Sequence, residues 1–243
     1  MTLPDPALPA AAPHNPLVPR VAPLRGLGIA AIALIAAACL VDIAYVWSDW
    51  YGYGLARDYV AGKPGVLVAD LDRADSIALV LAVLYASFVA AAGIVFIVWL
   101  YRARTNAELI NGAEHRRGRG WVIGGWFCPI VNLWFPHQVV QDVWRTSDPA
   151  APADLYTVAG LRPSPLVRWW WAALLSAFVI ERMWYKLSDD EADPIGWLKR
   201  SAVVDMVTTA LSCAAAVLVA LIIRRIGEWQ AIPRPPREDW RRA

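Results

Sequence analysis

The chain of 243 residues contains only three cysteines and three histidines. Each cysteine lies in an apolar segment, and no two of them have the spacing of metal ligands or of a disulfide framework. The histidines, His14, His115 and His137, are equally scattered, so no pair of them has ligand spacing. We therefore expect no disulfide framework, no metal site and no bound cofactor.

Catalytic motifs are also missing from the sequence. The glycines nearest to a phosphate loop, Gly118, Gly120, Gly124 and Gly125, follow no expected strand and lack the lysine that such a loop requires. The chain has no serine hydrolase motif and no visible pairing of a nucleophile with a base. We expect a protein that is not an enzyme.

A strong excess of one charge is absent as well. The 23 basic residues nearly balance the 21 acidic ones, which leaves a formal net charge of +2. The positive residues fall in several loops rather than in a single patch. This distribution predicts no nucleic-acid partner.

What the sequence has in abundance is apolar residues. They make up 58% of the chain against 18% charged residues, and the mean hydropathy of +0.40 lies outside the usual range of soluble domains. Four apolar segments, residues 26–47, 77–101, 166–185 and 202–223, are each about as long as the roughly 20 residues that a helix needs to cross a bilayer. We expect an all-α membrane protein with four transmembrane helices.

A fifth apolar stretch, residues 121–147, differs from these four because prolines break it. Pro129 and Pro136 each remove a backbone donor, and irregular backbone survives in lipid only where protein or water covers its polar groups. Asn132 lies between the two prolines and could supply part of that cover. We expect this stretch to be a re-entrant or interfacial helical element rather than a fifth crossing.

The part of this stretch that follows Pro136 is amphipathic. Apolar residues at positions 136, 139, 140, 143 and 144 fall on one helical face. The opposite face carries His137, Gln138, Gln141, Asp142 and Arg145. This pattern is typical of a helix that lies in the headgroup plane or packs over other helices.

The arginines predict the orientation of the chain. Cytoplasmic loops of membrane proteins carry an excess of arginine and lysine, whereas the loops after the first and third spans are rich in acidic residues. A multi-pass protein of the plasma membrane with both termini in the cytoplasm satisfies every loop. The cytoplasmic arginines either serve only to set this topology or also contact anionic lipid headgroups; they are Arg102, Arg104, Arg116, Arg117, Arg119, Arg224 and Arg225.

Three domains follow from this pattern. Residues 1–25 hold seven prolines and many alanines, which indicates a disordered cytoplasmic tail. Residues 26–230 form the helical membrane domain, and residues 231–243 form a basic cytoplasmic tail.

Four ionisable residues fall inside the expected spans, where charge is costly and usually faces a partner or a cavity. Asp42, Glu181, Arg182 and Asp205 should lie at similar depth in the outer leaflet. One interpretation is a salt-bridged cluster of Asp42, Arg182 and Asp205 with Glu181 nearby. Another is that these side chains reach water or fasten helices together, and a third is an ion or proton route, for which the inner halves of the spans offer few polar groups.

The central stretch also resembles a known family signature. Its matching residues are Gly125-Trp126-Phe127, Pro129-Ile130, Asn132-Leu133-Trp134, Pro136, Gln138-Val139-Val140, Asp142 and Trp144-Arg145. Together with Arg102-Ala103-Arg104-Thr105-Asn106, and with Arg224-Arg225-Ile226 and Gln230, they resemble domain-of-unknown-function family 4328, a bacterial membrane family. The resemblance covers roughly residues 77–230. It implies a multi-spanning membrane protein without an assigned activity and brings no catalytic residues.

From these patterns we expect an interaction or scaffold module whose cytoplasmic face contacts lipid headgroups or a protein partner. The alternative is a small oligomeric transporter or channel in which the re-entrant stretch lines a pathway. Membrane lipids are the expected partners, and a protein partner or a second copy of the chain stays open. The candidate interaction motif consists of Trp126, Pro129, Asn132, Trp134, Pro136, Gln138, Asp142, Trp144 and Arg145.

Overall fold

The computed structural model describes residues 21–152, 156–188 and 193–233, and within them it is all helical, with no strand. Most of the expected N-terminal tail (residues 1–20) and of the C-terminal tail (residues 234–243) lies outside the described residues. The α-helices are α1 (Arg25–Val60), α2 (Val68–Ile110), α3 (Trp121–Phe127), α4 (Phe135–Ser147), α5 (Pro165–Leu187) and α6 (Pro194–Gln230). Two short 3₁₀ turns, η1 (Val131–Leu133) and η2 (Val158–Gly160), flank α4.

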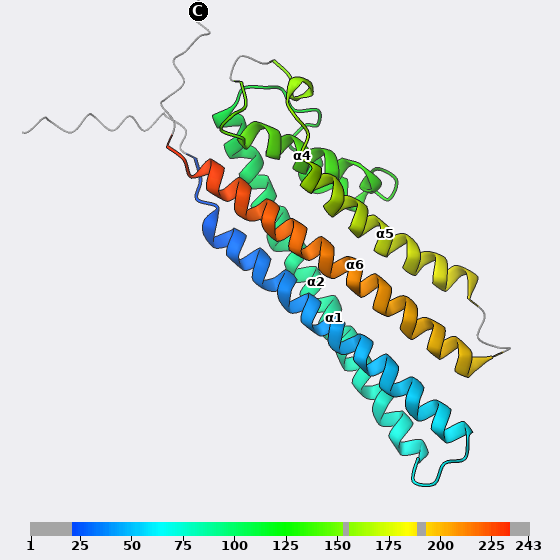
Figure 1. The fold of residues 1–243 in the computed structure, drawn as a ribbon. Helices are drawn as coiled ribbons and strands as arrows, with labels where there is room; N and C mark the ends of the chain where they lie inside the picture. The colour runs from blue at the N-terminus through cyan, green and yellow to red at the C-terminus, as the bar shows by residue number, and fades with distance from the viewer. Residues whose placement is uncertain (1–20, 153–155, 189–192, 234–243) are drawn as a thin grey trace, which may run out of the picture.

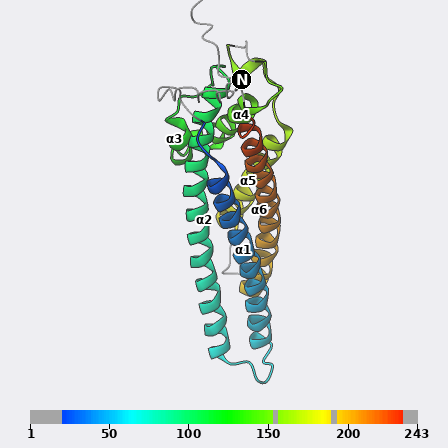
Figure 2. The ribbon, with the colours of Figure 1, turned by 90° about the vertical axis from the view of Figure 1, so that its left-hand side faces the viewer.

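The four long helices run side by side, and the short elements gather at one end of them (Figure 1). Helix α1 packs against α2 and α6, and α5 packs against α6. Helices α3 and α4 sit at the end where α2 finishes and α5 begins, and the described N-terminal residues reach the same end (Figure 2). We call this end, with the loops of residues 111–120 and 156–164, the cap.

The all-α fold is confirmed, and three of its helices, α1, α2 and α6, are long and apolar enough to cross a membrane. Helix α5 contains the fourth expected segment in its 23 residues. Its expected span also carries Arg168, Glu181 and Arg182, whereas each of the other three expected spans carries at most one charged residue. A count of four crossings therefore stays a prediction.

The helices extend well beyond the expected spans. Residues 48–60 continue α1 and residues 68–76 begin α2, so the outer loop is much shorter than the sequence suggested. Nothing breaks α1 before Gly62, which takes a positive φ of 67° that favours glycine. At 36 residues α1 is about 54 Å long, roughly 24 Å more than the hydrocarbon core. Helix α1 is therefore longer than a membrane crossing requires.

Two helix starts follow directly from their sequences. Ser164 precedes Pro165, and its hydroxyl accepts a hydrogen bond from the Val167 amide. Asp193 precedes Pro194 in the same way and accepts from the Gly196 amide at 2.8 Å. Proline suits the first helical position because a backbone N–H at that position would have no acceptor within the helix, so its absence costs no hydrogen bond.

Tight packing is concentrated toward the cap. Trp99 and Leu100 of α2 and Ile222 and Ile226 of α6 are fully buried there, together with the valines of α4. Toward the outer end the same helices expose large apolar side chains such as Val80. Apolar side chains that face outward along a spanning helix are in contact with lipid. Helix-helix packing therefore buries large side chains mainly near the cap.

Candidate functional site

The central stretch is broken where its prolines predicted a break. Helix α3 ends at Phe127, two residues before Pro129, and α4 begins at Phe135 with Pro136 in its first turn. At 7 and 13 residues the two helices are about 10 and 20 Å long, too short to cross a core of about 30 Å.

Residues 127–134, which join the two helices and which we call the apolar tip, are exposed and hydrophobic. Phe127 is 74% exposed and Ile130 is 70% exposed, and Leu133 and Trp134 are also exposed. Cys128, in the same turn, is an exposed free cysteine. An exposed apolar patch of this kind marks a surface that meets a partner or a membrane.

The apolar tip is held against the bundle at its base. The Trp171 Nε1 of α5 donates a hydrogen bond to the Leu133 carbonyl at 2.8 Å, which satisfies one backbone group that the break leaves free. Trp126 packs edge-on against Trp171, with ring centroids 6.1 Å apart, and against Phe96 of α2. The Asn132 side chain, expected to cover such groups, makes no hydrogen bond within the described residues; its backbone amide donates to the Cys128 carbonyl.

The polar face of α4 is covered by protein, whereas its pattern also allowed a helix that lies in the headgroup plane: Gln141 and Asp142 are buried, and the other polar residues of this face are half-buried. Asp142 has a fully buried side chain and pairs with Arg116 of the preceding loop. The Arg116 Nη2 and Nε donate to Asp142 Oδ1 at 2.6 and 2.9 Å, and the Arg116 backbone amide donates to Oδ2 at 3.0 Å. Periodicity showed that this face is polar but not that residues 111–120 fold back over it.

Other residues of the candidate interaction motif also bind partners inside the protein and hold the cap in place. The Gln138 Oε1 accepts from Arg117 Nε at 2.9 Å, and Arg145 donates to the Val158 carbonyl at 3.3 Å. Trp144 is half-buried and packs against Trp229 of α6, with ring centroids 4.7 Å apart. These three side chains, and Asp142, thus have partners inside the protein.

Gln230 joins three helices at one point. From the end of α6 its Nε2 donates to the Ala103 carbonyl of α2 at 2.9 Å and to the Ser147 hydroxyl of α4 at 2.8 Å. The Gln141 amide, oriented so that its oxygen accepts from the Ser164 amide at 2.6 Å, joins α4 to the start of α5. The cap is therefore tied to the bundle by buried amide side chains.

The arginines expected to contact headgroups divide into two groups. Arg102, Arg224 and Arg225 are exposed at the cap end. Arg104 is only 4% exposed; its Nε donates to Glu108 Oε1 at 2.8 Å and its Nη2 to the Arg117 carbonyl at 3.1 Å.

The remaining loop arginines already have protein partners. Arg119 pairs with the other Glu108 oxygen. Arg117 lies over the Phe135 ring, 3.9 Å from its centroid. Arg116 pairs with Asp142, as described above.

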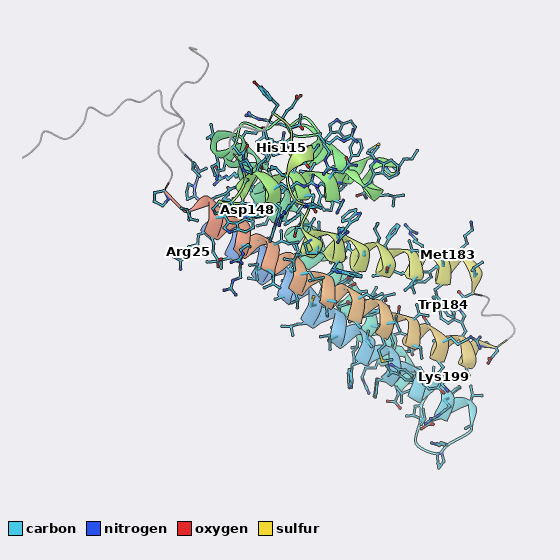
Figure 3. All side chains as sticks on the ribbon, turned by 45° about the horizontal axis from the view of Figure 1, so that its top comes forward. Arg25, His115, Asp148, Met183, Trp184 and Lys199 are labelled. Carbon is cyan, nitrogen blue, oxygen red and sulfur yellow. The ribbon has the colours of Figure 1, made fainter. Side chains whose placement is uncertain are left out.

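His115 is a site residue that the sequence did not single out. It comes from the arginine-rich loop yet is only 7% exposed, and it lies inside the cap (Figure 3). Neither ring nitrogen has a hydrogen-bond partner among the residues that the structure describes. Burial lowers the pKa of His115 to about 3, and the nearby charges of Arg104 and Arg116 act in the same direction. His115 is therefore neutral at physiological pH.

The expected intramembrane cluster is only partly assembled. The Asp42 carboxyl is buried beside the Thr209 hydroxyl, and Asp205 accepts a hydrogen bond from Ser201 at 3.4 Å. Arg182 is exposed and lies over the Phe178 ring instead, 5.6 Å from its centroid. In the described part of the chain no ion pair joins Arg182 to Asp42 or to Asp205, so these side chains do not form the salt-bridged arrangement that we considered.

Several hollows lie between the described residues, and three of them bear on function. A groove of about 630 Å³ lies between α1 and α6 at their cap ends and is lined by Arg25, Gly28, Trp99 and Arg224, among others. A cavity of about 220 Å³ lies between the long helices around Asp42. A third, of about 530 Å³, lies under the arginine-rich loop around His115.

Comparison with known proteins agrees with the sequence signature. No curated protein and no solved structure matches the chain. The sequence model of one family, described as "Domain of unknown function (DUF4328)", matches residues 64–228, which include α2 to α5 and most of α6. This chain is a member of the DUF4328 family.

Proposed function

We propose that the protein is a non-enzymatic interaction module of the plasma membrane, whose cap rests on the cytoplasmic leaflet and contacts its lipids. The observation that carries this proposal is the apolar tip. Its side chains Phe127 and Ile130 are the most exposed large apolar groups of the stretch, and the hydrogen bond from Trp171 to Leu133 fixes the tip beside the bundle. A surface of this kind suits the boundary between headgroups and acyl chains.

In the proposed topology α1, α2, α5 and α6 all cross the membrane, and both termini lie in the cytoplasm. The exposed arginines Arg102, Arg224 and Arg225 gather at the cap end, which is where the positive-inside rule puts the cytoplasm. Residues 121–147 then return to the side from which they entered. The apolar tip forms the deepest point of that re-entrant path.

The groove between α1 and α6 supports a lipid partner independently of the apolar tip. It opens beside Arg25 and Arg224. The fully buried Trp99 also lines it, and the Trp99 Nε1 has no hydrogen-bond partner in the described ranges. An anionic glycerophospholipid matches this lining, with its phosphate near the arginines and an ester carbonyl as acceptor for Trp99. Each basic side chain near an anionic surface contributes about 1 kcal/mol.

The depth of Cys128 tests the proposal. A protein with Cys39→Ala and Cys213→Ala keeps one cysteine, at the apolar tip, for a fluorescent label. In reconstituted vesicles we expect nitroxide-labelled lipids to quench this label strongly and aqueous iodide to quench it weakly. The matched control is a label at Ala150→Cys, an exposed position of the same cap, which iodide should reach. If the label at Cys128 were quenched like the label at Ala150→Cys, the proposal would fail.

A second candidate function is passage of a small solute or ion. One observation favours it: the cavity of about 220 Å³ between the long helices is lined by Asp42, Tyr85 and Ser212 in an otherwise apolar surface. Flux across vesicles that is lost in Asp42→Asn but kept in Asp75→Asn, an exposed outer position, would support it. No flux, or flux equal in both variants, would refute it.

A further inference from the structure

We propose that the cavity under the arginine-rich loop is a binding site for a phosphate group, either as a free anion or as the phosphomonoester of a larger molecule. The cavity has a volume of about 530 Å³ and is lined by Arg104, Glu108 and the loop residues 111–119. Arg104 and His115 provide its two buried contacts. The site is separate from the apolar tip, so it does not depend on how deep that tip lies.

Arg104 brings a buried guanidinium with one donor group unused. Its Nε and Nη2 bind Glu108 and the Arg117 carbonyl, which fixes the plane of the group. Its Nη1 is buried and has no hydrogen-bond partner within the described part of the chain. Buried donors of this kind are rare in native proteins because an unmet donor costs free energy. A ligand oxygen in the cavity would meet it with a charge-assisted hydrogen bond.

His115 brings a second unused donor from a different element. Both of its ring nitrogens lack a partner among the described residues, and one of them carries a proton in the neutral imidazole. Its ring is close enough to Arg104 for the arginine charge to lower the pKa of the histidine. Two buried donors, one from α2 and one from the loop, thus belong to side chains that line one cavity, and a tetrahedral oxyanion offers acceptors in several directions.

The charge of the lining favours an anion. Four arginines line the cavity, Arg104, Arg116, Arg117 and Arg119, and they outnumber the two glutamates, Glu108 and Glu114, by two. Asp142, which pairs with Arg116, lies under the loop and is not part of the lining. Because Asp142 already neutralises Arg116, one positive charge remains in excess, and a monoanionic phosphate would neutralise it without displacing any existing ion pair.

The size of the cavity leaves room for more than a phosphate ion. Its volume is comparable to that of pockets that hold small-molecule ligands, so a phosphate at Arg104 and His115 can carry an organic group. The source of that phosphate is either a soluble metabolite or a lipid headgroup that bears a phosphomonoester. The experiment below separates these two sources.

The first arm uses inorganic phosphate and the full chain in nanodiscs of phosphatidylcholine. Line broadening of the ³¹P signal, at constant ionic strength with chloride, measures binding. We expect His115→Leu to weaken binding about tenfold or more, the loss expected for one hydrogen bond to a charged group. This substitution removes no hydrogen bond of the protein itself, so the cap should stay folded. His137→Leu, outside the cavity, is the matched control and should bind as the wild type does.

The second arm uses nanodiscs that contain phosphatidic acid, with retained lipid counted by native mass spectrometry. Retention that depends on His115 in this arm, without binding of inorganic phosphate in the first, assigns the site to a lipid headgroup. Binding in the first arm assigns it to a soluble phosphate. Equal behaviour of the wild type and His115→Leu in both arms would overturn the proposal.

A charge comparison adds an independent check. Arg104→Gln and Arg102→Gln remove the same charge two residues apart, but only Arg104 lines the cavity. We expect Arg104→Gln to weaken binding at least tenfold and Arg102→Gln to change it less than twofold. Equal losses in both variants would show a diffuse charge effect instead of a site.

Discussion

A soluble protein buries apolar side chains and exposes polar ones, and the two halves of the central stretch each depart from this pattern. The first half ends in the apolar tip, where Phe127 and Ile130 are exposed. The second half is α4, where Gln141 and Asp142 are buried. The two halves are joined at Trp134: the first exposes apolar side chains, and the second buries polar ones.

The difference shows which interactions hold each half in place. The apolar tip keeps its position through one hydrogen bond from Trp171 and through ring packing around Trp126. Helix α4 keeps its position through an ion pair and through hydrogen bonds with α6 and with both cap loops. Loss of a polar partner should therefore unfold the cap, whereas loss of an apolar side chain from the tip should change only what it contacts.

Among the variants, we expect Arg116→Ala to lower the free energy of unfolding the most. It leaves the fully buried Asp142 carboxylate with only the backbone amide of position 116 as partner. A buried charge without its counterion lowers the free energy of unfolding by about 3 kcal/mol. Denaturation in mixed micelles measures this loss. The control is Arg102→Ala, which replaces an exposed arginine and should hardly change the free energy of unfolding. Adding Asp142→Asn should recover part of the loss because it removes the stranded charge; no recovery would contradict this account.

Gln230→Leu should have the next largest effect. It removes the hydrogen bonds from Nε2 to Ala103 and Ser147 that join α6 to α2 and α4. We expect a loss of about 2 kcal/mol in the free energy of unfolding. Gln138→Leu, which breaks only a contact with the half-buried Arg117, should cost less. Equal losses in the two variants would show that Gln230 does not join the cap to the bundle.

Lowering the pH should destabilise the cap because His115 becomes protonated when the cap unfolds. The folded pKa of about 3 lies below the unfolded value of about 6.5, so the folded state binds fewer protons and becomes less stable as pH falls through that window. At pH 5 we expect a loss of about 1 to 2 kcal/mol relative to pH 7. Hydrogen exchange of residues 111–120 in phosphate-free buffer measures it. His115→Leu should remove this pH dependence; if its exchange keeps the wild-type pH dependence, another group titrates.

The smallest effect on stability should come from the apolar tip. Phe127→Ser changes an exposed side chain, so we expect less than about 0.5 kcal/mol in the free energy of unfolding. In vesicles the same variant should reduce quenching of the Cys128 label by nitroxide-labelled lipid. Tyr156→Ser, an equally exposed aromatic in a cap loop, is the control and should leave that quenching unchanged. A large loss of stability in Phe127→Ser would show that the tip is part of the core.

Hydropathy and proline positions predicted much of this fold. The apolar segments became the long helices, and Pro129 marked where the central stretch breaks, because both signals are local to the chain. The outer ends of α1 and α2 were not predicted to be helical. Their charged and aromatic residues look like those of a loop, although nothing in them stops a helix before Gly62.

The burial of polar groups in the cap could not be read from the sequence. The period of α4 separated apolar from polar positions, but Asp142 is buried only because Arg116 folds back across it. His115 sits among arginines and looks solvated, yet it is enclosed by the same loop. Both outcomes depend on contacts between residues far apart in the chain, which a local pattern does not contain.

The position of Gln230 also bears on how the protein is made. Its side chain comes from the end of α6 and bridges α2 and α4, both of which leave the ribosome earlier. The bridge cannot form until α6 has been synthesised and inserted. The earlier helices therefore lack this link between them until the last helix is inserted, and that insertion completes the assembly.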